Sequence, residues 1–441
     1  MSPRATADHL LDQLQADAFA CLCGVIAPNT GLVRDSSLPD APASIAACGM
    51  ALLSHAVAAQ RGFITRSAAA QYVRSSLIFL LGAPQGAQPN ATGHHGFFYH
   101  FLDPSTGRRT ADCELSTIDT AIFIAAALLV SAYFDGAHAV EREIRTCADA
   151  LYQRVDWAWA MDGGPTVSHG WKPESGFLAP RWEGYSEGLF LYILALGSPT
   201  HAVGREAYEA WTRSYRWLSL YDIEYLHAGP LFIHQMSHYF LDLRGIRDAP
   251  MRAKMIDYAE NSRRATLVQR RYAMANPLGF RAYGPLCWGI TACDGPGPLS
   301  RTIDGAPRDF LGYGARGAPF GPDDGTIAPW AVAASLPFAP EIVMPALEHT
   351  QDLCLRGEAW TSGCLPTFNA TVNGPDAAPW VADRHYPLNQ CPVLIMLENA
   401  RSAAPWSWSR RCAPLIAGLR AAGFTGGYLD EPAIAGGSTG P

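Results

Sequence analysis

The chain has 441 residues, of which 49% are hydrophobic and 17% are charged, and its formal net charge is −7. This composition supplies a large apolar core, and the lack of a Lys/Arg block argues against nucleic-acid and anionic-membrane partners. The longest apolar run, residues 118–134, contains Asp119 and Ser131 and is too short to span a membrane.

The first residues do not form a secretory signal, because Met1-Ser2-Pro3-Arg4 leads directly into an amphipathic helix. We therefore expect a cytoplasmic protein, or a periplasmic one if a leader has been removed. The chain has 11 cysteines and no Cys-x-x-Cys pair. Cys21 and Cys23 are too close for an easy mutual disulfide, while Cys48 and Cys147 fall in helical apolar patterns. We therefore predict buried, reduced thiols.

Helical periodicity dominates the sequence, and several predicted helices carry start signals. Ser116-Thr117-Ile118-Asp119 is similar to a capping box, and Pro329 falls in a first turn. The predicted helices cover residues 5–24, 41–60, 66–82, 116–134, 138–157, 184–197, 203–219, 229–243, 248–275, 326–337, 340–354, 390–401 and 409–422.

Strand signals are sparse, and the best is the aromatic segment 95–102. The Gly/Pro-rich stretch 276–325 is long for a loop inside a compact domain, which predicts a functional role. No Pro/Ser-rich linker divides the chain, so we predict one domain over residues 1–425 and a disordered tail over 426–441. About a dozen helices without an intervening sheet favour an all-α fold, a closed toroid of paired helices; an irregular helical array is the alternative.

Residues 181–187 provide the first candidate site. Glu183 and Glu187 stand four residues apart beside Trp182 and Tyr185, and an apolar run follows. Aromatic faces stack on sugar rings, and paired carboxylates cleave glycosidic bonds. A carboxylate among aromatic rings has a raised pKa, as a general acid requires. The alternative is a solvated helix face on which both acids lie; we favour Glu187 as a catalytic acid.

A second candidate site surrounds the start of the predicted helix 116–134. His100 and Arg109 precede Glu114 and Asp119, which would stand at the mouth of an inner helix. Arg109 would then hold a carboxylate or sugar hydroxyls. Alternatively, Asp119 is only the N3 partner of a capping box and complements the helix dipole.

A third candidate is an aromatic, Gly-rich segment that contains Tyr283, Trp288 and Asp294. It is either a sugar-binding loop or an ordinary Asp-Gly turn. The following Asp323-Asp324 pair either caps a helix or binds a sugar.

His234 and His238 stand one helical turn apart, as in a zinc motif. Gln235 replaces the glutamate that such a motif uses as a base, so we favour helix packing or sugar contact over metal binding. The sequence contains no G-x-S-x-G, Walker or dinucleotide motif, so acyl-transfer, phosphoryl-transfer and hydride chemistry lack support.

Taken together, these segments resemble the glycoamylase-like domain family of glycoside hydrolases, which includes bacterial endo-β-1,2-glucanases. The resemblance implies an (α/α)6 toroid that hydrolyses β-1,2-glucan or related β-glucan oligosaccharides with inversion, without a metal or organic cofactor. The similar stretches follow one another in unbroken order at residues 29–33, 96–101, 114–121, 171–177, 182–187, 194–201, 229–235, 288–296 and 324–329.

The resemblance also implies roles for individual residues. Glu187 becomes the acid, and Asp119 with Glu114 becomes the base or a base-side group. The predicted substrate-binding residues are Trp182, Tyr185, Arg109, Trp288, Asp294, Tyr283 and His100.

Two departures from the family pattern stand out. Family members carry an Asp in a G-I-D-Q-G-P segment, whereas this chain has Asn389 within Pro387-Leu388-Asn389-Gln390-Cys391-Pro392. If that acid is the base, this protein is slow, uses Asp383 or Asp119, or acts differently. The alternatives are a β-glucan-binding protein impaired in catalysis, and a glycosidase or transglycosylase of another linkage specificity. The segment 20–23 also lacks the usual aromatic residues, which alters an outer subsite.

Overall fold

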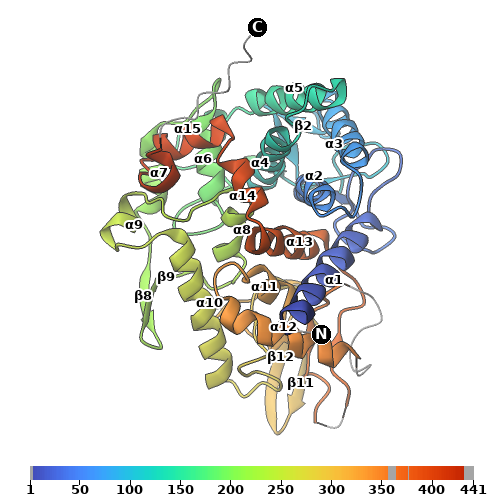
Figure 1. Cartoon of the computed structure of the whole chain (residues 1–441), viewed down its shortest axis with the longest axis vertical. Coiled ribbons are helices and arrows are strands. Elements are labelled where there is room, and N and C mark those ends of the chain that lie inside the picture. The colour runs from blue at the N-terminus through green and yellow to red at the C-terminus, as the bar shows by residue number, and fades with distance from the viewer. Residues whose placement is uncertain (1–2, 356–363, 376, 432–441) are drawn as a thin grey trace.

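The computed structural model describes residues 3–355, 364–375 and 377–431 (Figure 1). Fifteen α-helices lie within these residues. They are α1 Pro3–Cys23, α2 Ile45–Gln60, α3 Arg66–Leu81, α4 Thr117–Tyr133, α5 Ala139–Arg154, α6 Leu189–Gly197, α7 Arg205–Thr212, α8 Ile233–Phe240, α9 Ala249–Ala253, α10 Tyr258–Ala275, α11 Pro329–Ala334, α12 Pro340–Leu355, α13 Pro387–Arg401, α14 Ala404–Ser409 and α15 Ala413–Ala421.

Six of these helices form an inner ring, because they are buried on nearly all sides. They are α2, α4, α6, α8, α11 and α13. Helix α13 packs on α2, α2 on α4, α4 on α6, α6 on α8, and α11 on α13. Gln235 of α8 completes the ring by donating to the Ala331 carbonyl at 2.7 Å and the Ser335 hydroxyl at 2.8 Å.

The other long helices cover this ring from outside. Helix α1 packs on α13, α3 on α2, α5 on α4, α10 on α8 and α12 on α11, while α7 and α15 pack on α6. Figure 1 shows α3 and α5 on the outside of α2 and α4. An apolar helix fits inside such a ring and an amphipathic one outside it. Outer and inner helices alternate along the chain from α1 to α8 and again from α10 to α13. This arrangement confirms the predicted α/α toroid.

Sixteen short strands are found in the described ranges, in six small antiparallel sheets. The largest sheet has the order β2-β3-β5-β6-β7, and β5 leads directly into α4. The strands are β1 Ala43–Ser44, β2 Gly93–His94, β3 Phe97–Tyr99, β4 Phe101–Leu102, β5 Leu115–Ser116, β6 Gly170–Lys172, β7 Gly176–Phe177, β8 Trp217–Leu220, β9 Ile223–Leu226, β10 Ala292–Cys293, β11 Leu299–Ile303, β12 Ala306–Phe310, β13 Gly314–Ala315, β14 Thr326–Ile327, β15 Phe368–Asn369 and β16 Trp380–Val381.

The predicted helices 203–219 and 248–275 are interrupted in the structure. The range 203–219 ends early, because α7 stops at Thr212 and a hairpin of β8 and β9 follows. The hairpin packs Tyr225 against Val268 of α10, so tertiary contact decides its structure. The range 248–275 is divided into α9 and α10, because Met255 has a φ of 57°, which interrupts a right-handed helix.

A disulfide joins Cys21 in α1 to Cys364, so the prediction of reduced thiols is wrong for this pair. The two cysteines are 343 positions apart, so no sequence pattern predicts that they lie close together in the fold. The predicted tail starts at Gly426, yet residues 427–429 form a 3₁₀ turn in which Leu429 is buried. Residues 432–441 lie outside the described part of the chain. No helix in the described ranges has the length and apolarity needed to cross a membrane.

Candidate active site

The first turn of α4 places a carboxylate where the inner helix begins. Ser116 is the N-cap and accepts a hydrogen bond from the Asp119 N–H at 3.2 Å. The Ser116 hydroxyl in turn donates to Asp119 Oδ2. Asp119 is only 8% exposed, and its carboxylate lies at the positive end of the helix dipole. The predicted capping role is therefore present, and it holds the carboxylate in one orientation.

His100 lies between two carboxylates at this helix end. Its Nδ1 is 2.9 Å from Glu114 Oε1, and its Nε2 is 3.7 Å from Asp119 Oδ2. Burial lowers the pKa of His100, but the charges of Asp119 and Glu114 outweigh burial and raise it to about 9. His100 is therefore an imidazolium at neutral pH. Although burial opposes ionisation of Glu114, its hydrogen bond with His100 gives it a lowered pKa.

Glu187 stands directly before α6 and is half-buried. Burial is the main cause that raises its pKa to about 7, and the negative charge of Asp119 adds to the shift. The helix was predicted to begin at residue 184, but Gly184 has a φ of 75°, residues 185–188 form a bend and a turn, and the helix begins at Leu189. Glu183 and Glu187 therefore do not share a helix face, and Glu183 is exposed and accepts from Thr166.

Asp35 is a further acid of this site that the sequence did not single out. Burial is the main cause that raises its pKa to about 6; His100 opposes the rise and Asp119 adds to it. Asp35 follows the stretch 29–33 that resembles the family, which was the available signal. We call Asp35, His100, Glu114, Asp119 and Glu187 the acidic cluster.

Asp294 lies beside this cluster in a fixed ion pair. It is 4% exposed, and its Oδ2 is 2.9 Å from Arg384 Nε. The rings of Tyr313 and Tyr386 lie nearby in a tilted arrangement, with their centroids 5.2 Å apart. Burial raises the pKa of Tyr386 to about 12, and the charges of both Asp294 and Asp35 contribute. Asp294 thus belongs to the surroundings of the acidic cluster.

Asn389, which replaces the family acid, lies in the first turn of α13 and is 6% exposed. It lines a small cavity together with Asp294, Arg384 and Tyr386. Of the two acids predicted to replace the missing one, Asp119 lies in the acidic cluster, whereas the side chain of Asp383 is 86% exposed.

Three of the predicted sugar-binding residues make contacts within the protein in this structure. Trp288 is fully buried in the main core, and its subsite role stays a prediction. Tyr283 donates to Asp323 at 2.6 Å and packs near Phe280. Arg109 is committed to Glu174, which it binds with two hydrogen bonds of 2.6 and 3.0 Å. The sequence indicated these side chains only by their residue types, and their contacts are known only from the tertiary structure.

Trp182 and Tyr185 belong to the loop that precedes Glu187. The Trp182 indole donates to Thr117 at the start of α4, and its face is covered by His169 at a centroid distance of 3.9 Å. His169 therefore lies over the ring that was predicted to contact sugar. Tyr185 is half-buried and packs against Tyr215.

His234 and His238 both belong to the packed interior of α8. His234 Nε2 donates to the Ala228 carbonyl, and His238 Nε2 lies 3.1 Å from the Ser262 hydroxyl. Burial lowers the pKa of both imidazoles, to about 3 and about 4. These contacts agree with the predicted packing role.

Comparison with known proteins connects this architecture to a described family. The model of the Glycoamylase family, described as a putative glucoamylase, matches residues 180–413. The exo beta-1,2-glucooligosaccharide sophorohydrolase (non-reducing end) of Parabacteroides distasonis is 28% identical, over 91% of this chain and 56% of that protein. The chain thus spans little more than half the length of this curated relative.

Solved structures match over almost the whole chain. A putative glucoamylase from Bacteroides uniformis matches with a TM-score of 0.83 and 27% identity, covering 96% of this chain and 99% of that one. The endo-beta-1,2-glucanase from Chitinophaga pinensis, solved with sophorotriose and glucose, matches with a TM-score of 0.82 and 25% identity, over 96% and 99%.

Fold and site define an α/α-toroid protein with an acidic cluster at the N-terminal ends of its inner helices. More particularly, the chain belongs to the Glycoamylase family, because the family match covers more than half of it.

Proposed function

We propose that this protein is a glycoside hydrolase that cleaves β-1,2-glucan or related β-glucan oligosaccharides with inversion. The observation that carries the proposal is the pair Glu187 and Asp119. Glu187 has a pKa of about 7, while Asp119 faces an imidazolium and a helix N-terminus. Two carboxyl groups whose environments differ in this way divide the roles of acid and base between them. The named activities of the two β-1,2-glucan-active relatives support the choice of substrate.

In the proposed reaction, Glu187 gives its proton to the leaving glycosidic oxygen as that bond breaks. A water molecule attacks the anomeric carbon from the opposite face, and a carboxylate on that side takes up the water proton. Asp119 is our candidate for this base, with Glu114 and Asp35 beside it. His100 supplies a positive charge between Glu114 and Asp119, and its hydrogen bond lowers the pKa of Glu114. The chemistry needs no metal or organic cofactor.

The direct test is hydrolysis of linear β-1,2-glucan by the wild type and by Glu187→Gln. The substitution removes the transferable proton, so we expect a rate loss of roughly 10²–10⁴-fold. Wild-type activity should fall as the pH rises through about 7, because Glu187 then loses its proton. Full activity of Glu187→Gln would rule out Glu187 as the acid.

A matched control is Glu183→Gln, because Glu183 is exposed and lies outside the acidic cluster. Its activity should stay close to wild type. In the wild-type reaction, NMR detection of the first-formed anomer tests inversion: β-linked substrate should give α-anomeric product. A panel of β-glucans then tests the linkage, and a β-anomeric first product would contradict inversion.

The alternative function is β-glucan binding with impaired catalysis, which Asn389 favours. Such a protein would bind β-1,2-glucooligosaccharides in calorimetry and release no reducing ends over days. A cytoplasmic location also stays a proposal, and fractionation of the native cells would test it. The Cys21–Cys364 disulfide is typical of oxidising compartments and favours the periplasmic alternative.

A further inference from the structure

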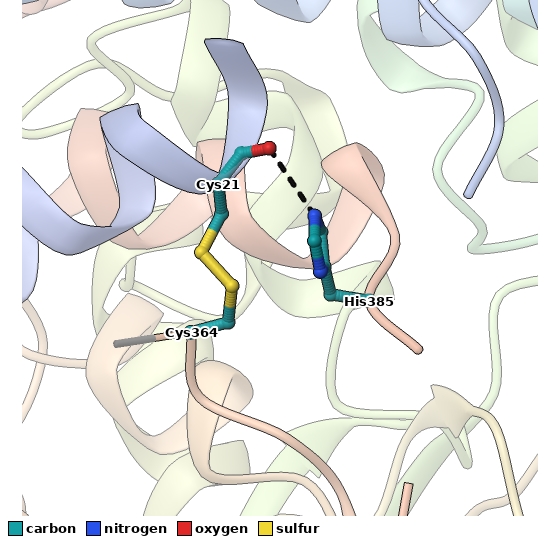
Figure 2. A group of neighbouring side chains, drawn as sticks. All are labelled: Cys21, Cys364 and His385. Carbon is teal, nitrogen blue, oxygen red and sulfur yellow. Dashed lines mark hydrogen bonds between the residues drawn. A yellow bond between two sulfur atoms is a disulfide. The ribbon is translucent and has the colours of Figure 1, made fainter. Parts of the chain in front are cut away.

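Three side chains from distant parts of the sequence meet beside the end of α1 (Figure 2). Cys21 belongs to α1, Cys364 precedes β15, and His385 precedes α13. Their two sulfur atoms and one imidazole nitrogen all lie within 4.8 Å of one another. Among the residues that the structure describes, no other group of three or more His, Cys, Asp or Glu side chains has this metal-ligand spacing.

His385 is held in an orientation that suits a metal ligand. Its Nε2 lies 3.2 Å from the Cys21 carbonyl, as the dashed line in Figure 2 shows. A carbonyl only accepts hydrogen bonds, so Nε2 carries the proton and Nδ1 keeps its lone pair. Metal-binding histidines commonly donate their second ring N–H to a backbone carbonyl. The His385 backbone is fixed as well, since its N–H donates to Ser37 Oγ and its carbonyl accepts from the Ser37 N–H.

We propose that Cys21, Cys364 and His385 bind a zinc ion when both cysteines are reduced, and that the disulfide is the oxidised form of the same site. Zinc prefers thiolate and imidazole ligands at about 2.3 Å and about 2.0–2.1 Å, which puts tetrahedral ligand atoms roughly 3.5–3.8 Å apart. The observed limit of 4.8 Å accommodates that spacing. A water molecule would complete the four ligands.

The two forms interconvert by balanced steps. A dithiol reductant supplies two electrons and two protons, breaks the S–S bond and itself becomes a disulfide. Zinc then displaces the two thiol protons and forms two Zn–S bonds and one Zn–N bond. In the reverse direction, a low-molecular-weight disulfide accepts two electrons from the two thiolates and two protons from solvent and leaves as two thiols, while the protein S–S bond forms again and zinc departs as Zn²⁺.

Both forms would fasten α1 to the segments around the acidic cluster. Arg384, adjacent to His385, holds Asp294 at 2.9 Å. Leu365 and Thr367, close to Cys364 in sequence, line the same small cavity as Asp294. The site thus adds a direct link from α1 to the segments that flank the paired strands β15 and β16, and metal binding adds to their stability. The inference does not depend on the substrate of the protein.

The test measures zinc bound to the full-length protein after reduction, exposure to Zn²⁺ and removal of free metal. We expect one zinc ion per reduced chain and none on the oxidised chain. With Co²⁺ as probe, the reduced protein should show a sulfur-to-cobalt charge-transfer band. Cys364→Ser should abolish this band, and His385→Ala should weaken zinc affinity by more than about tenfold.

The matched control is Cys23→Ser, because Cys23 is an exposed free thiol on the same helix. This variant should bind zinc as the wild type does. Circular dichroism checks that each variant is folded, and the comparison of oxidised with reduced wild type requires no variant. The proposal would be overturned if the reduced wild type bound no zinc, or if Cys364→Ser bound as much zinc per chain as the wild type. Cys21 and Cys364 would then form only a disulfide and no metal site.

Discussion

At the scale of single residues, His100 determines the electrostatics of the site. Its positive charge lies between the carboxylates of Glu114 and Asp119, which would otherwise repel each other. Burial raises the pKa of Glu187 to about 7 without an opposing cation, whereas His100 opposes the corresponding rise at Asp35. In the proposed mechanism, the position of this one imidazole therefore separates the acid from the base.

His100→Ala should show this role in the pH dependence of stability. The pKa of His100 rises from 6.5 to about 9 on folding, so its contribution is complete below pH 6.5 and is lost as the pH rises through 9. We expect the wild type to exceed the variant by about 1–3 kcal/mol in unfolding free energy at low pH, with a smaller difference above pH 9. Urea unfolding over this pH series measures it. A difference that stays constant with pH would contradict the assigned charge.

At the scale of elements, the hairpin of β11 and β12 is secured by a buried ion pair. Arg316 is fully buried and binds Asp324 through Nε at 2.7 Å and through a second nitrogen at 2.8 Å. Asp324 also accepts from the Leu311 N–H beyond the hairpin. The stretch 276–325 is thus ordered by charge pairing. A sequence pattern offers little indication of this, because the two partners are recognised only when the chain folds back.

Asp324→Ala should cost about 3–5 kcal/mol of unfolding free energy, because it leaves the Arg316 guanidinium buried without a counter-ion. The comparison variant is Asp304→Asn in the turn of the same hairpin, where Asp304 pairs with Arg281 at an exposed site. That change should cost no more than about 1 kcal/mol. Urea unfolding compares the two, and equal costs would show that the Arg316 pair is not the anchor.

At the scale of the whole molecule, the toroid depends on close approach between inner helices. Gly49 of α2 lies against α4, where an added Cβ would stand 2.5 Å from the Phe123 Cα and 2.8 Å from the Phe123 nitrogen. Because both atoms belong to the backbone, a side chain at this position must push the helices apart.

Gly49→Ala should therefore lower the free energy of unfolding by about 1–3 kcal/mol. The effect would appear even though alanine favours a helix over glycine by about 0.8–1.0 kcal/mol. Thermal unfolding measures the change. Gly24→Ala is the control, since a Cβ there meets no atom closer than 3.6 Å. A stabilised Gly49→Ala variant would contradict the close packing of α2 and α4.

By itself the sequence determined the helical architecture, because the apolar period of outer helices such as α5, the apolar run of α4 and the Ser116 cap are local signals. It also determined the acid–aromatic segment around Glu187 and the cap position of Asp119. The order of the family-like segments was likewise readable along the chain, and the structural matches bear out the toroid.

Only the tertiary structure decided which of these side chains meet. It placed His100 between two acids, brought Asp35 to them, buried Trp288 and engaged Arg109 with Glu174. It also brought Cys21 to Cys364. The physical reason is that helix periodicity arises between residues three or four apart, whereas burial and charge pairing arise between residues that become neighbours only after the ring has closed.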